Sequence, residues 1–85
     1  MKHVERRATD MEHLTILTRD LTPFEHLVAG HLCDGLSNVA IANATAHTEK
    51  VVENTVSRMA KALGVKSAPD VNIRVLIALA YRAHF

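Results

Sequence analysis

The sequence has little of several residue types: one cysteine, no tryptophan, three glycines and two prolines among its 85 residues. The single cysteine, Cys33, excludes a disulfide within the chain and is typical of a reducing compartment. No apolar run approaches the roughly 18–20 residues that a transmembrane helix needs. The first ten residues mix charges of both signs and lack an apolar stretch, unlike a secretory signal. We therefore expect a single-domain cytoplasmic protein without membrane contact.

An excess of charge of either sign is also lacking, because ten basic and nine acidic side chains leave a net charge of only +1. The distribution is uneven. Residues 21–47 carry only Glu25 and Asp34, whereas residues 48–66 carry four basic and two acidic side chains. A local excess of basic side chains is what binding to DNA phosphates requires, although a solvated helix face would carry the same charges.

Motifs of the common enzyme classes are missing, since there is no glycine-rich phosphate loop, nucleophile motif or convergent carboxylate pair. Six histidines raise the question of a metal site. No two of them are four residues apart, and no second cysteine accompanies Cys33. We expect His31 and His47 to fill partly buried positions and Cys33 to be an inert core residue. The sequence thus predicts no enzyme activity, no metal and no cofactor.

The turn residues divide the chain into helix-length segments, with little of the alternation that indicates strands. We expect helices at approximately residues 2–19, 23–34, 37–44, 49–63 and 70–84. Thr22, Ser37 and Thr48 each precede a segment and can cap it, and Glu25 completes a capping box with Thr22. Gly35 and Gly64 are expected to end the second and fourth segments, and Pro69 to open the last.

Apolar spacing predicts which side of each helix is buried. In residues 49–63 the inward positions are Val52, Val56, Met59 and Leu63. In residues 23–34 they are Leu27, Val28, Leu32 and either His31 or Cys33. Residues 2–19 carry an apolar stripe typical of an arm or a helix docked on a partner, formed by Val4, Ala8, Met11, Leu14 and Leu17. Residues 70–84 are apolar on more than one face, so we expect the core to cover one side and a second copy the other.

The side of residues 49–63 that lies opposite the apolar positions is polar. It holds Lys50, Asn54, Ser57 and Lys61, flanked by Glu53 and Arg58. A short helix, a turn and a longer helix with a polar outer side is the layout of a helix-turn-helix, whose second helix can enter the major groove of DNA.

A family resemblance rests on the following residues: Leu21-Thr22-Pro23, Glu25, Gly35-Leu36-Ser37-Asn38, Ile41-Ala42, Val52, Ser57-Arg58 and Leu63-Gly64-Val65. With this pattern the chain resembles the LuxR-type (GerE-like) helix-turn-helix domain at the C-terminus of many bacterial response regulators and quorum-sensing regulators. The resemblance implies an all-α, four-helix LuxR-type domain over residues 21–85. Its recognition helix would lie at about 49–63 and its dimerisation helix at about 70–84, after an additional N-terminal helical arm at 1–20.

Several positions depart from the usual family pattern. Phe24 and Val39 replace residues that are usually or often basic in the family. Val51, Glu53 and Thr55 replace threonine, lysine and histidine, and Thr45 and His47 replace apolar residues. The change at Glu53 bears most on function, because the lysine commonly found there touches DNA.

Helical geometry and the resemblance together nominate the contact residues. Base edges would be met by Glu53, Asn54 and Ser57, since asparagine pairs with adenine and glutamate accepts from the cytosine amino group. Phosphates would be met by Ser37, Thr48, Lys50, Arg58, Lys61 and Lys66. Several of these residues also have a plainer structural interpretation. Glu53 could pair with Lys50 or Lys61, and Arg58 could form a salt bridge within the domain. Ser37 and Thr48 could serve as helix caps alone. The dimer interface would involve Val75, Leu76, Leu79 and Tyr81.

We therefore expect a bacterial, sequence-specific transcription regulator that binds double-stranded DNA as a homodimer and associates with the nucleoid when bound. Its half-sites would lie about one DNA turn apart, roughly 34–36 Å. The alternative is a degenerate helix-turn-helix that serves as a protein-interaction module for another regulator or RNA polymerase. Low net charge, Glu53 and Val39 favour the alternative, whereas the polar outer side of residues 49–63 favours DNA.

Overall fold

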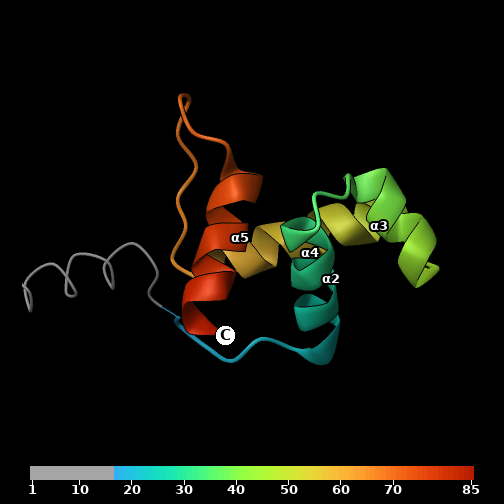
Figure 1. The fold of residues 1–85 in the computed structure, drawn as a ribbon, viewed down its shortest axis with the longest axis horizontal. Coiled ribbons are helices and arrows are strands. Elements are labelled where there is room, and N and C mark those ends of the chain that lie inside the picture. The colour runs from blue at the N-terminus through green and yellow to red at the C-terminus, as the bar shows by residue number, and fades with distance from the viewer. Residues whose placement is uncertain (1–16) are drawn as a thin grey trace, which may run out of the picture.

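A computed structural model describes residues 17–85 of the chain (Figure 1). Between these residues the chain forms four helices and no strand, which confirms the all-α prediction. The helices are α2 (Pro23–Cys33), α3 (Asn38–Thr45), α4 (Glu49–Ala62) and α5 (Ile73–His84). The helix expected at residues 2–19 lies mainly outside the described residues.

The prediction of a helix is wrong for its last residues, because residues 17–20 are not helical. The Thr18 amide donates to the Ala62 carbonyl at 2.6 Å, and the Thr18 hydroxyl donates to the same oxygen at 3.3 Å. A backbone amide that is committed to another helix cannot bond within its own. Residues 17–20 therefore form a strap that ties the chain to the C-terminal end of α4.

Side-chain caps fix where three of the helices begin, as the sequence predicts. The Thr22 hydroxyl accepts from the Glu25 amide at 3.1 Å, and the Glu25 carboxylate accepts from the Thr22 amide at 2.8 Å, so the capping box is complete. Ser37 and Thr48 accept from the amides three residues later, both at 3.2 Å. These bonds satisfy amide groups that the first turn of a helix leaves without partners.

The last helix begins three residues later than expected. Pro69 does not open it; instead the Asn72 side chain accepts from the amides of Arg74 and Val75 at 3.1 and 3.4 Å. An asparagine cap satisfies two free amides, which a proline at the first helical position does not do. At the other ends, Gly35 and Gly64 adopt φ of +83° and +70°, as expected of helix stops.

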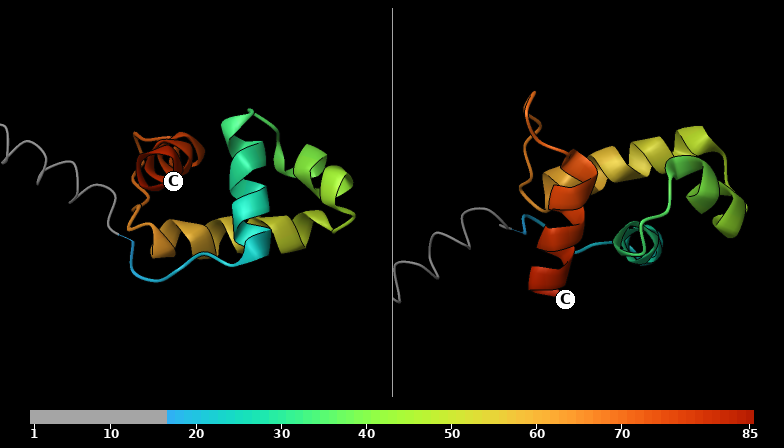
Figure 2. Two further views of the ribbon diagram at one scale, coloured as in Figure 1. Left: turned by 60° about the horizontal axis from the view of Figure 1, so that its bottom comes forward. Right: turned by 45° about the horizontal axis from the view of Figure 1, so that its top comes forward.

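The other three helices pack around α4, the longest of the four. Figure 2 shows α5 near the C-terminal part of α4, α2 across its middle and α3 near its N-terminal part. The core lies where these helices cross. It includes all four inward positions expected on α4 and, from the other helices, Val28, Ala29, Leu32, Ile41, Ala42, Ile77 and Ala80. Alanines at these crossings let the helix axes approach closely.

Two expected core positions, Leu27 and Cys33, are wrong, and so is the partly buried position expected for His47. Leu27 is 49% exposed, because α2 buries the arc that holds Glu25, Val28, Ala29 and Leu32 and leaves its other side open. His47 is exposed rather than partly buried, and its ring lies against Phe24 with centroids 4.5 Å apart. His31 is partly buried, as expected, whereas Cys33 is also only partly buried and is therefore not a core residue.

Candidate nucleic-acid interface

A tight turn joins α3 to α4 and sets the angle between them. Ala46 takes the left-handed conformation, with φ of 57°, and the His47 amide donates to the Ala42 carbonyl at 2.9 Å. The Thr45 hydroxyl donates to the Ile41 carbonyl at 2.8 Å. The Thr45 hydroxyl is thereby satisfied within α3.

The structure brings the expected polar residues to one exposed side of α4. Lys50, Asn54, Ser57 and Lys61 are all exposed, and at 100° per residue they fall within an arc of about 60°. At 1.5 Å per residue they extend over roughly 16 Å of helix. That length exceeds the ~12 Å width of the DNA major groove, so a helix laid across a groove would carry the row from one wall to the other.

Glu53 and Arg58 flank this row on opposite edges, and both are exposed. In residues 17–85 the ion pairs are Arg19–Glu25 and Arg58–Glu25, so Glu53 pairs with neither Lys50 nor Lys61. The interpretation of Glu53 as one member of a surface pair therefore has no support in the geometry. Its carboxylate remains available at the edge of the polar row.

The starts of α3 and α4 differ as phosphate sites. The oxygens of Ser37 and Thr48 both accept capping bonds, which leaves each exposed hydroxyl able to donate to another acceptor. No acidic residue lies in the first turn of α3, whereas Glu49 places a negative charge beside the free amides of α4. Ser37 is thus the better placed of the two for an anion. Lys66 is exposed but follows Gly64, so it lies off the α4 row.

A buried carboxylate lies behind the candidate interface. The Glu25 side chain is 2% exposed, and its two oxygens accept from the two terminal nitrogens of Arg19, each at 2.7 Å. These bonds hold the pKa of Glu25 far below its usual range, at about 2, against the opposing effect of burial; the Thr22 amide and the nearby Arg58 charge add to the lowering. Glu25 is therefore ionised throughout the neutral range.

Arg58 lies at the edge of the salt bridge expected within the domain. Its Nε lies 4.0 Å from Glu25 Oε2, and a terminal nitrogen donates to the Thr55 hydroxyl at 3.2 Å. The side chain is nevertheless 58% exposed. Thr55 itself is fully buried and donates to the Val51 carbonyl at 2.8 Å, a role that sequence inspection missed.

Arg19 was also missed as a structural residue, because the sequence suggested a helical arm over residues 1–20. One signal for it was available. Glu25 is one of only two charged residues between 21 and 47 and faces inward at the cap position, so its charge needs a basic partner.

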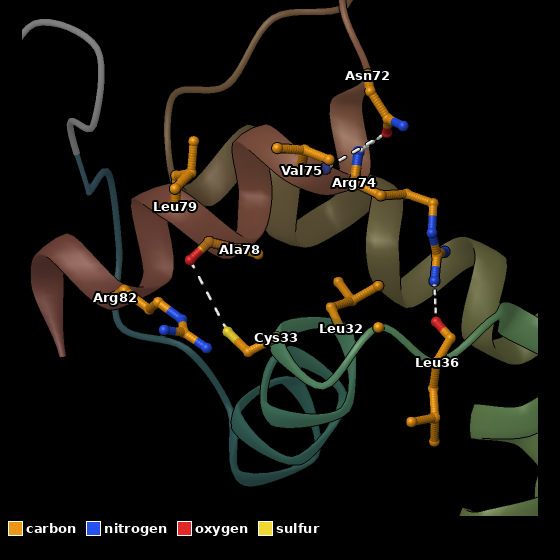
Figure 3. Close-up of a pocket in the computed structure, with 10 residues that line it drawn as sticks. Leu32, Cys33, Leu36, Asn72, Arg74, Val75, Ala78, Leu79 and Arg82 are labelled. Atoms are coloured by element: carbon orange, nitrogen blue, oxygen red, sulfur yellow. Dashed lines mark hydrogen bonds between the residues drawn. The ribbon is translucent and has the colours of Figure 1, made fainter.

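The predicted dimer residues separate into two groups. Val75 and Leu79 are 51% and 59% exposed, lie one turn apart and line an open groove between α5 and the end of α2 (Figure 3). Leu76 is partly buried. Tyr81 instead turns toward α2, where its hydroxyl lies 2.9 Å from His26 Nδ1. The structure therefore leaves Val75 and Leu79 free for a second copy and uses Tyr81 within the domain.

Comparison of the chain with models of protein families, with curated proteins and with solved structures found no match. No helix between residues 17 and 85 has both the length and the apolarity to cross a membrane. Within the same residues, no group of three or more His, Cys, Asp or Glu side chains is arranged to hold a metal ion. What the domain does must be inferred from its own residues.

Proposed function

We propose that this domain is a LuxR-type helix-turn-helix that binds double-stranded DNA in the bacterial cytoplasm and regulates transcription, with α4 as the recognition helix. The observation that carries the proposal is the division of α4 into two sides. Val52, Val56 and Met59 are buried on one side, while the polar row of Lys50, Asn54, Ser57 and Lys61 is exposed on the other. A polar outer side is common on surface helices, but here it follows a short helix and a tight turn, which together are the layout of a helix-turn-helix.

The side chains of the row fit the two kinds of DNA contact. Lys50 and Lys61 at its ends would meet phosphates on the two walls of the groove, and Arg58 would meet another at the edge. Asn54 lies between the lysines, where it would reach base edges, with Ser57 beside it. Glu53 would favour cytosine, because a carboxylate accepts from the cytosine amino group.

A second copy would complete the DNA-binding unit. We propose that the dimer forms through the exposed α5 face of Val75 and Leu79 and places one α4 in each half-site. The deciding experiment is selection of duplexes from a randomised pool at physiological salt, followed by sequencing. We expect an inverted repeat whose halves lie about one DNA turn apart.

Lys61→Glu tests the role of α4 directly. We expect binding to weaken for all duplexes and the salt dependence to flatten, because a phosphate contact is lost. Lys66→Glu makes the same charge change off the α4 row and should have a smaller effect. Equal losses in the two variants, measured by fluorescence anisotropy, would indicate non-specific attraction in place of a recognition helix.

A second candidate function is a protein-interaction module for another regulator or for RNA polymerase. It is favoured by the surface of α2 and α3, which has no lysine or arginine and exposes Leu27 and Val39, the latter to 52%. A folded protein that enriches no duplex in the selection would favour this candidate.

A further inference from the structure

Two arginines lie beside the single carboxylate of Glu25. Arg19 takes both carboxylate oxygens in a bidentate pair, with both distances 2.7 Å. Arg58 approaches the same carboxylate only to 4.0 Å, from its Nε atom. A bidentate, hydrogen-bonded pair is much stronger than a contact at 4.0 Å, so Arg19 satisfies Glu25 and Arg58 does not.

The position of Arg19 also keeps it between α2 and α4. The same nitrogen that bonds Glu25 Oε2 lies 3.5 Å from the Arg58 backbone carbonyl, and the neighbouring Thr18 is bonded to Ala62. The guanidinium of Arg58 is consequently held at the edge of α4 by Thr55, with more than half of its side chain exposed. This is the edge at which α4 would meet a phosphate.

We propose that Arg19 is a positioning residue: by occupying Glu25 it releases Arg58 to contact a DNA phosphate. Arg19 and Arg58 compete for the buried carboxylate of Glu25. An ionised carboxylate that is 2% exposed requires a partner, because its burial without one is costly. In residues 17–85 the other basic group within 4.0 Å is Arg58, so loss of Arg19 would draw Arg58 inward.

The phosphate contact rests on the proposed function, but the position of Arg58 can be measured without DNA. We would record the Nε–Hε resonance of Arg58 by NMR in the full chain, comparing the wild type with Arg19→Gln. The expected result is a downfield shift and slower solvent exchange of this proton, since it enters a short bond to Glu25. In the double variant Arg19→Gln/Glu25→Gln the resonance should return toward its original position.

Two further variants serve as a control and as a milder test in the NMR experiment. Arg82→Gln removes the same charge from an exposed site on α5 and should leave the Arg58 resonance unchanged. Arg19→Lys keeps the charge but presents no bidentate fork to Glu25. It should give a smaller shift in the same direction, and it serves as the test if Arg19→Gln does not fold.

Binding to the selected duplex, measured against salt, tests the consequence for DNA. In Arg19→Gln we expect weaker binding and a smaller salt slope, because each protomer loses one phosphate contact; the slope should fall by about 0.9 per protomer, or about 1.8 for the dimer. The double variant should recover that slope, which would not happen if Arg19 itself touched the phosphate. Arg82→Gln should keep the wild-type slope.

An Arg58 resonance that stays in place in both Arg19 variants overturns the proposal, whatever happens to DNA binding. A resonance that moves while the salt slope does not change also overturns it, because Arg58 would then not contact phosphate. A wild type that binds no duplex overturns the proposed function instead, and the two failures are distinguishable because the NMR experiment contains no DNA.

Discussion

Glu25 joins two local structures that would otherwise be independent. One of its oxygens completes the capping box at the start of α2, and both bind Arg19 in the strap of residues 17–20. The packing of the strap on the helices thus depends on one ionised side chain. The low pKa of Glu25 is the physical sign of this dependence.

Acid should weaken the domain for the same reason. The pKa of Glu25 falls from 4.5 to about 2 on folding, so the folded state favours the ionised form. The resulting stability is fully present above about pH 5 and is lost as the pH falls through 4.5 toward 2. We expect a loss on the order of 2 kcal/mol in the free energy of unfolding, moderated by the solvent exposure of Arg19. Urea titrations at a series of pH values measure it.

Glu25→Gln is the control for this acid effect. At neutral pH the variant should have a lower free energy of unfolding than the wild type. Between about pH 5 and pH 2 its free energy of unfolding should fall by much less than that of the wild type. A wild type and variant that lose stability in parallel would show that other carboxylates account for the acid dependence.

Asn54→Ala concerns recognition at the scale of one side chain. We expect it to relax the preference at one base pair by about 1–3 kcal/mol, because asparagine can form two hydrogen bonds with adenine. The measurement is the site preference obtained from duplex selection. Asn43→Ala removes an exposed amide from α3, outside the α4 row, and should leave that preference unaltered; a preference unchanged in both variants would refute the role of Asn54.

For single residues, the sequence predicted the interactions that join residues close together in the chain. The caps at Thr22, Ser37 and Thr48 were correct because a cap acts over three residues. The pair of Arg19 with Glu25 was missed, since a salt bridge between a strap and a helix has no local pattern. Leu27 was wrongly placed in the core. The spacing of apolar residues shows which of them share one side of a helix, but it does not show how wide an arc of that helix its neighbours bury.

Among the elements, α4 is the one that the sequence defined best. Its apolar residues recur every three or four positions, and both its cap and its glycine stop are where the pattern predicted them. The start of α5 was less well defined, because Pro69 and Asn72 are both acceptable starting signals. The choice of Asn72 depends on Arg74, whose guanidinium donates to the Leu36 carbonyl and to the Asn38 side chain and so fixes the first turn of α5 against α3.

Thr48→Ala tests how far the cap supports α4. The hydroxyl accepts from the Val51 amide at the start of the helix, so its loss should lower the free energy of unfolding by about 1 kcal/mol. Thr48→Ser keeps the acceptor and should retain nearly all of the stability. Chemical denaturation compares the three proteins, and equal stability of the alanine and serine variants would contradict a capping role.

Across the whole molecule, α4 contributes to the core on one side and leaves its other side open, and α5, near the C-terminal part of α4, does the same. The sequence anticipated both open sides from their composition. It could not show that Tyr81 turns toward His26, because that contact joins residues 55 positions apart.

Leu79→Asp tests the open side of α5. We expect a dimeric wild type and a monomeric variant by light scattering, because a charge at the centre of an apolar interface is costly to bury. Leu27→Asp places the same charge at a comparably exposed leucine on α2 and should remain dimeric. A dimer that persists in Leu79→Asp, or one that is lost in Leu27→Asp, would move the interface away from α5.

The absence of lysine and arginine from α2 and α3 also bears on how such a protein would find its targets. Proteins that slide far along DNA stay attached through many phosphate contacts that take no account of sequence. Here the cations of the proposed interface are confined to α4 and its edge, so arbitrary DNA would hold the domain only briefly. It would travel between target sites by repeated dissociation and diffusion through solution, with little scanning along the duplex.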